Sequence, residues 1–292
     1  MIVIWDIKIK AHLTMPPKPK KLSTETRQVV KSNALVEASY RLTLGEQQIL
    51  LLAIAKISDY NEVTESTAFT VSTQELVETF KVLPANAYRL LQDAAEQLFV
   101  RVVVIDKPDP KDPHLLKTKT RWVQSIGYRP GLSQITLRFA HDMLPYLSGL
   151  SREFTRYRLA YTAGMTSVYA VRIYEMLVQW KSKGELDVEL DWLREKFDLP
   201  PSYSGISELK KRVVKPAIDQ INEHSDLWVK WDQRKRGRQV VAFIFTFGLK
   251  SEKKLDPEKP APKKRMTTEE MAQFAKPGES WEELKRRLGV GR

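Results

Sequence analysis

The chain has 292 residues, of which 48 are Lys or Arg and 36 are Asp or Glu, and its formal net charge is +12. A hydrophobic fraction of 42% is sufficient for packed cores, and the length corresponds to about two domains. The excess of positive charge favours a polyanionic partner such as nucleic acid, while the absence of cysteine excludes disulfides and cysteine-ligated zinc fingers.

Residues 1–26 are predicted to form a disordered basic arm. The segment 16–21 reads PPKPKK, which is typical of a solvated tail, and binding of this arm to DNA is the alternative interpretation. Met15 precedes this segment directly and is an alternative to Met1 as the start. No stretch approaches the roughly 18 apolar residues that a membrane span requires, so we expect a cytoplasmic protein.

Residues 27–147 are predicted to form a first domain around a central helix. Thr43 and Glu46 have the spacing of a capping box, in which each residue's side chain bonds to the other's backbone N–H. The helix 46–57 that follows is apolar on nearly every side, so we expect it in the middle of this domain.

A second capping box, formed by Ser72 and Glu75, comes directly after the strand candidate 68–71. This arrangement predicts a strand-to-helix junction. The elements expected after it are a helix at 85–98, strands at 101–105, 122–128 and 134–139, and a wing loop at 107–114.

The same order of elements returns from Asp187 onward. A helix at 167–180 takes the place of the central helix, and Leu83-Pro84 between the earlier helices is echoed by Leu199-Pro200. The repeated elements are a strand at 187–190, helices at 191–197 and 206–221, and strands at 227–232 and 239–247.

Two helices that are joined by a short turn and closed by a β-hairpin are typical of the winged helix-turn-helix, a DNA-reading motif. We therefore predict an α+β fold of two tandem winged-helix domains related by internal duplication, with disordered basic tails. The second domain is expected at 148–250, and 251–292 is expected to be a flexible Lys/Pro-rich tail with short helices. A partner-binding helix around Trp281, Leu284 and Leu288 is the alternative for this tail.

Positive charge differs between the two copies. The helix 85–98 is nearly neutral outside its apolar face, whereas the equivalent second helix is basic near its beginning. Its predicted DNA-binding residues are Ser207, Lys210, Lys211, Arg212 and Lys215. Lys and Arg at this place can donate to guanine O6 and N7 or to flanking phosphates. Pro216 removes one backbone donor and is expected to kink this helix.

The hairpin at 231–240 concentrates further cations around Gly237. A tight turn crowded with like charges repels itself unless an anion is present, so we predict a wing that contacts the sugar-phosphate backbone. A solvated basic turn is the alternative. The predicted backbone-binding residues are Arg234, Lys235, Arg236 and Arg238.

Signals for catalysis are weak in this sequence. No Gly-Lys pair occurs, which excludes the phosphate-binding loop of ATPases. The four histidines are isolated and form no His-x-His pair of the kind that rolling-circle nickases require. We therefore expect no enzyme activity, no metal and no cofactor.

Three segments resemble the initiator replication proteins of iteron-containing theta plasmids. They are Asn33–Ile57, Phe154–Glu175 with its FTRYRL and SVYAVRIYE motifs, and Asp191–Phe247, which runs from DWLREKFDLPPSY to FIFTF. The resemblance implies that monomers bind direct repeats in a plasmid origin and promote its opening. It also implies that homodimers joined through the first domain repress their own gene, in a bacterial cytoplasm. A host DnaA-type initiator, the replicative helicase and chaperones are the implied partners.

In this family, base reading centres on the start of the second long helix, which corresponds here to Lys210, Lys211 and Arg212. Relatives can carry three arginines in this cluster and another at the position of Gly205. Lysine lacks the planar fork that reads guanine with two hydrogen bonds, so the target sequence of a relative does not transfer. A transcriptional regulator without a replication role is the alternative function, and a rolling-circle nicking enzyme is a third.

Overall fold

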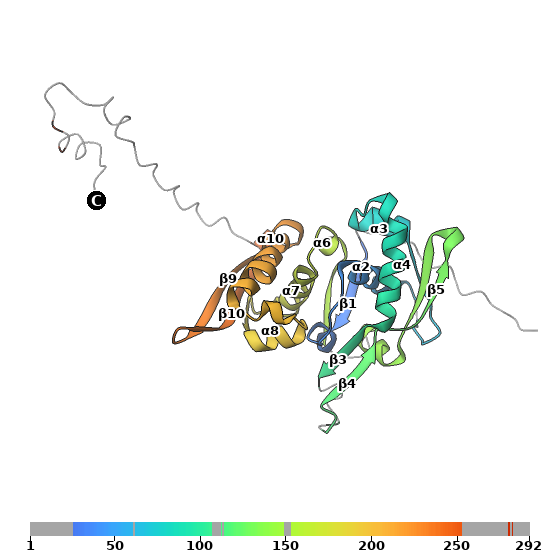
Figure 1. The fold of residues 1–292 in the computed structure, drawn as a ribbon, viewed down its shortest axis with the longest axis horizontal. Coiled ribbons are helices and arrows are strands. Elements are labelled where there is room, and N and C mark those ends of the chain that lie inside the picture. The colour runs from blue at the N-terminus through green and yellow to red at the C-terminus, as the bar shows by residue number, and fades with distance from the viewer. Residues whose placement is uncertain are drawn as a thin grey trace, which may run out of the picture. The chain divides into compact units, whose positions relative to one another are not determined.

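The computed structural model describes residues 26–60, 62–106, 112, 114–148, 153–252, 280 and 282. The chain divides into two units after Lys250, and the first unit contains the two winged-helix domains (Figure 1). The predicted basic arm, most of the loop 107–114 and the tail helix around Trp281, Leu284 and Leu288 lie outside the described residues. No helix among the described residues is long and apolar enough to cross a membrane.

The central helix of the first domain is α2 (Leu44–Ile54), and every residue from Glu46 to Ile54 is buried. Thr43 accepts a hydrogen bond from the Glu46 backbone while Glu46 caps the Thr43 N–H, which confirms the predicted capping box. Arg101 donates to the buried Glu46 carboxylate at 2.9–3.1 Å, so a residue 55 positions later in the chain also holds this capping box in place.

The strand-to-helix junction at Ser72 is confirmed as well. Strand β2 (Phe69–Ser72) leads directly into α3 (Thr73–Phe80), and Ser72 and Glu75 form a complete capping box. The long helix α4 (Pro84–Val100) follows, with Pro at its first turn, where the missing N–H costs nothing. Strands β5 (Val123–Arg129) and β6 (Gln134–Phe139) join β2 in the sheet order β2-β6-β5.

A second, two-stranded sheet pairs β3 (Val102–Asp106) with β4 (Lys117–Arg121). Strand β4 was not expected, because its sequence KTKTR has no apolar side chain to signal a buried face. In Figure 1 this hairpin projects away from the helices.

The second domain repeats this order with α7 (Val168–Gln179), β8 (Glu185–Glu189) and α8 (Leu190–Lys196). The next helix is continuous but has three parts, α9 (Ile206–Leu209), η5 (Lys210–Val214) and α10 (Lys215–His224). Strands β9 (Leu227–Arg236) and β10 (Gln239–Leu249) complete a sheet of order β8-β10-β9. After α3 and α8, Lys81 (φ 58°) and Asp198 (φ 44°) both adopt the left-handed conformation, so the two copies also share their turn geometry.

A further two-stranded sheet joins the start of the described chain to a strand that follows the first-domain elements. Strand β1 (Gln28–Ser32) is antiparallel to β7 (Phe154–Arg158), and α1 (Asn33–Val36) follows β1. The predicted domain boundary between residues 147 and 148 stays a prediction. It falls between the two partners of this sheet, because β1 precedes it and β7 follows it. The remaining short elements are η1 (Ile57–Asp59), η2 (Pro130–Leu132), η3 (His141–Met143), α5 (Leu144–Leu147), α6 (Ala160–Ala163), η4 (Pro201–Tyr203) and η6 (Lys250–Glu252).

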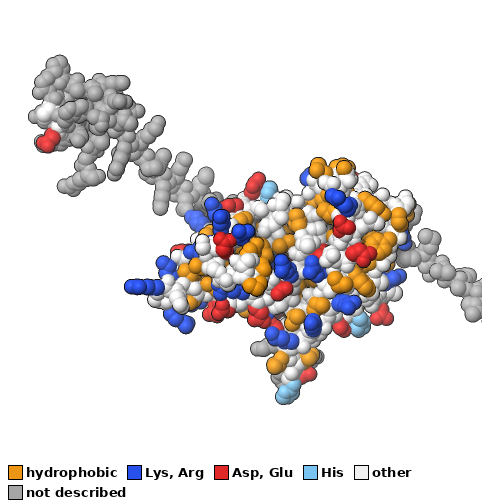
Figure 2. All heavy atoms as spheres, in the orientation of Figure 1, with side chains coloured by type: hydrophobic (Ala, Val, Ile, Leu, Met, Phe, Trp, Pro, Cys, Tyr) orange, Lys and Arg blue, Asp and Glu red, His pale blue; other side chains and the backbone are white. Residues whose placement is uncertain are grey.

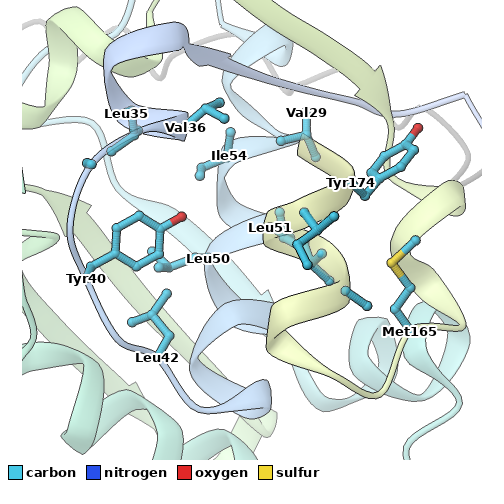
Figure 3. Packing of buried hydrophobic residues seen from close by; sticks show 14 of the residues in the cluster. Val29, Leu35, Val36, Tyr40, Leu42, Leu50, Leu51, Ile54, Met165 and Tyr174 are labelled. Carbon is cyan, nitrogen blue, oxygen red and sulfur yellow. The ribbon is translucent and has the colours of Figure 1, made fainter. Parts of the chain in front are cut away.

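One hydrophobic cluster runs through both domains. Figure 3 shows Leu51 of α2 directed toward α7, which carries Tyr174, while Tyr40 lies on the opposite side of α2. Beside this cluster lies a buried ion pair, in which Lys31 Nζ is 2.7 Å from Glu175 Oε1. Tyr157 donates to the same carboxylate oxygen at 2.5 Å. Burial, together with the charge of Glu175, raises the pKa of Tyr157 well above its ordinary value.

Candidate nucleic-acid interface

The recognition segment, residues 206–224, contains a π-helical turn directly before Pro216. Proline has no N–H for the carbonyl of Arg212, four residues earlier, so the α-helical ladder cannot continue there. The backbone N–H of Lys215 instead bonds to the carbonyl of Lys210, five residues earlier. The expected disturbance by Pro216 is thus a widened turn. Lys210, Lys211 and Arg212, three of the cations that were predicted to touch DNA, lie on this turn.

The two sides of this segment differ as predicted. Its apolar residues Leu209, Val213, Val214 and Ile218 are buried. Among the predicted DNA-binding residues, Ser207, Lys211, Arg212 and Lys215 are exposed, and Lys210 is half-buried. The segment therefore anchors one face in the core and presents donors on the other.

Arg212 is already held by its own helix. Its Nε bonds to the carboxylate of Glu208 one turn earlier, and its guanidinium lies 6.0 Å from the ring centre of Tyr203. The hydrogen bond and charge of Glu208 raise the pKa of Arg212. The i, i+4 spacing of Glu208 and Arg212 is visible in the sequence, but pairs of this kind occur on many solvated helices and do not by themselves indicate a site.

The wing is the β9–β10 hairpin, which turns at Gly237 with φ 61°. Lys235, Arg236 and Arg238 are exposed at its tip, where Figure 2 shows a group of basic side chains. Since only glycine adopts this conformation without strain, Gly237 fixes the tight turn that brings these cations together.

Arg234 differs from the tip cations. Its Nε lies 2.8 Å from Asp187 and its Nη2 lies 3.7 Å from Glu189, both on β8. The register explains the contact, because the small residue Ala242 on β10 is paired with Glu189 on one side and with Arg234 on the other. The hydrogen bond to Asp187 raises the pKa of Arg234 despite opposing desolvation. The structure does not test its predicted role at the DNA backbone, but Asp187 and Glu189 already satisfy its guanidinium.

The structure also brings a first-domain arginine close to the recognition segment. Arg41, exposed in the loop before α2, lines a cavity of about 450 Å³ together with Arg212 and Pro216. Nothing in the sequence signalled this, since a lone arginine in a loop carries no pattern. On the first domain itself, Lys119 and Arg121 are exposed along β4.

No group of three or more His, Asp or Glu residues that could hold a metal ion occurs in the described part of the chain.

Two family models match the chain. The model described as "Initiator Replication protein, WH1" matches residues 28–178, and the model described as "Initiator Rep protein, WH2" matches residues 189–247.

Individual relatives and a solved structure are also similar. A replication initiation protein of Escherichia coli is 28% identical over 228 residues, which cover 76% of this chain and 69% of the relative. An uncharacterised 27.6 kDa protein of E. coli is 28% identical over 234 residues, which cover 77% of this chain and 97% of that protein. The crystal structure of the Pi initiator protein in complex with iteron DNA aligns with a TM-score of 0.66 at 19% identity, over 78% of this chain and 99% of that one, and it supports the fold.

Proposed function

The chain belongs to the family of plasmid initiator replication proteins, and from this premise we propose that it binds repeated sites in a plasmid origin and promotes the opening of adjacent DNA. The observation that carries the proposal is the asymmetry between the two copies. One winged-helix domain combines an anchored recognition segment that has an exposed basic face with a wing whose tip is basic.

In this proposal, the recognition segment lies in the major groove and the wing follows the backbone. Arg212, Lys210 and Lys211 are the candidates for reading bases, because they lie near the start of the segment. Ser207 and Lys215 flank them. Lys235, Arg236 and Arg238 are the candidates for phosphate contacts, which orient the protein without reading sequence.

Autorepression by a homodimer and recruitment of host replication proteins form the second part of the proposal. Large apolar side chains are exposed on the first domain, among them Leu83 (68%), Leu116 (63%) and Leu132 (63%), and they support self-association through it. A host DnaA-type initiator, the replicative helicase and chaperones are the proposed partners, in the bacterial cytoplasm.

Footprinting the full chain on the DNA around its own gene tests this function. We expect protection of several direct repeats, each about one helical turn or a multiple of it from the next, and strand opening in adjacent DNA detected with permanganate. Protection of an isolated palindrome alone, without opening, would favour a transcriptional regulator. Binding that does not weaken between 50 and 200 mM salt would contradict the proposed DNA contacts, since each phosphate contact releases counterions.

A further inference from the structure

Arg172 on α7 is a buried arginine that donates to three backbone carbonyls on two separate chain segments. Arg172 is 5% exposed. Nη1 donates to the carbonyls of Tyr40 at 2.8 Å and Lys196 at 2.7 Å, and Nη2 donates to the carbonyl of Ala38 at 2.6 Å. Ala38 and Tyr40 belong to the loop that leads into α2 of the first domain. Lys196 is the last residue of α8 in the second domain.

Two aromatic rings hold the guanidinium plane of Arg172 in place and interact with its positive charge. The guanidinium centre lies 3.8 Å from the ring centre of Tyr40 and 4.6 Å from that of Phe197. A guanidinium stacks on aromatic faces and keeps its donors in one rigid plane, whereas an ammonium group does neither. Replacement by lysine therefore retains the positive charge and loses the geometry.

The two first-domain acceptors, Ala38 and Tyr40, lie just before Arg41 in the chain. Arg41 is exposed, and it lines the same cavity as Arg212 of the recognition segment. Arg172 itself lines this cavity. Its hydrogen bonds thus fix the stretch of backbone from which Arg41 projects, relative to the domain that carries Arg212.

We propose that Arg172 is a positioning residue for DNA binding, which holds Arg41 of the first domain beside Arg212 so that both domains contact one DNA site. Arg172 touches no DNA in this arrangement. It acts through the segment 38–41, and it converts two winged-helix domains into one continuous binding surface. The inference rests on the proposed DNA-binding function.

The first experiment measures this arrangement without DNA. Hydrogen exchange of the full-length protein is compared between wild type and Arg172→Lys. We expect faster exchange in the backbone amides of residues 38–44, while α4 and the β9–β10 hairpin keep wild-type rates. Unchanged exchange in 38–44 overturns the proposal whatever the DNA experiments show. A wild-type chain that binds no duplex overturns the proposed function and leaves the exchange result interpretable.

The second experiment is a double-mutant cycle with a labelled duplex that contains the protected repeats. Arg41→Ala is expected to weaken binding by about eightfold at 0.1 M salt, the effect of one lost phosphate contact. Arg172→Lys is expected to weaken binding by a similar factor, and the double variant by no more than the larger single effect, because both changes remove the same contact.

Two controls separate positioning from general destabilisation. Arg172→Lys combined with Arg236→Ala at the distant wing tip is expected to multiply the two single effects. Arg101→Lys changes another arginine that holds a buried partner, the Glu46 carboxylate. Its effect on DNA affinity is expected to be independent of Arg41→Ala, so that the two fold-changes multiply in the double variant. Multiplicative behaviour of the Arg172→Lys and Arg41→Ala pair would show that Arg172 does not act through Arg41. If Arg172→Lys fails to fold, Tyr40→Leu removes one stacking ring and takes its place in the same cycle.

Discussion

The charge at the tip of the wing leads to a quantitative prediction for Arg236→Ala. Arg236 is exposed and none of the ion pairs found in the described residues involves it, so its guanidinium is free to meet a phosphate. If about seven cations of the recognition segment and wing contact phosphates, the logarithm of the binding constant falls with log salt at a slope of about −6. Loss of one contact reduces this slope by about 0.9, which makes the decrease in affinity between 50 and 200 mM salt about 3.5-fold smaller.

Fluorescence anisotropy of a labelled duplex, titrated with the full chain at four or more salt concentrations, measures this slope. Arg234→Ala is the matched control, because it removes the same side chain from the same strand but from a position where Asp187 and Glu189 already hold it. We expect its slope to stay within about 0.3 of wild type, a third of one contact. A wild-type slope for Arg236→Ala, or an equal decrease of the slope for Arg234→Ala, would contradict a phosphate contact at the wing tip.

Four further predictions concern base reading and stability. Arg212→Ala is expected to cost about 1–3 kcal/mol of binding to the protected repeats and much less on random DNA, measured by competition. Glu208→Gln frees Arg212 from its carboxylate partner. It is expected to strengthen binding to random DNA and so to reduce the ratio of repeat binding to random-DNA binding in the same competition assay. Lys31→Met leaves the Glu175 carboxylate buried without its cation. Urea titrations are expected to show a free energy of unfolding that is lower by about 3–5 kcal/mol. A loss below about 1 kcal/mol would contradict a tightly buried ion pair. Because the folded-state pKa of Tyr157 is raised, its contribution to stability is complete below pH 10 and is lost above it. Above pH 10, the free energy of unfolding of Tyr157→Phe should therefore decrease less steeply than that of wild type, by up to about 1.4 kcal/mol per pH unit. An identical decrease in both proteins would refute this.

Local features of the fold were predictable where the sequence carries a local physical signal. The capping boxes at Thr43 and Ser72 were correct because each depends on residues only three positions apart. The duplication was recognisable because the spacing of apolar residues and the Leu-Pro turns recurs in both copies. Helix α2 was placed at the centre because it has no polar face that could meet water.

Features that depend on pairing between distant segments were not predictable. Arg234 belongs to a basic cluster in sequence, yet Asp187, 47 positions earlier, pairs with it once β8 and β9 flank β10. Arg172 had no recognisable signal in the sequence, because its acceptors are backbone carbonyls, and every residue has one. Strand β4 has an all-polar sequence, so only its pairing with β3 defines it.

The contact between Arg212 and Glu208 bears on how the recognition segment would discriminate between sequences. In the free protein, the guanidinium has a carboxylate partner one turn away and an aromatic ring beside it, so it must exchange these contacts for DNA. A guanine edge can replace them with two parallel hydrogen bonds, whereas a base with the wrong donors and acceptors leaves the exchange unfavourable. In the proposed complex, Glu208 would bring a negative charge close to the DNA, which would penalise close approach wherever Arg212 has not moved into the groove. An internal competitor of this kind lowers affinity for every sequence but lowers it least for the correct one, and specificity is this difference. The cations at the wing tip have no such competitor among the described residues, which suits contacts that must tolerate any sequence.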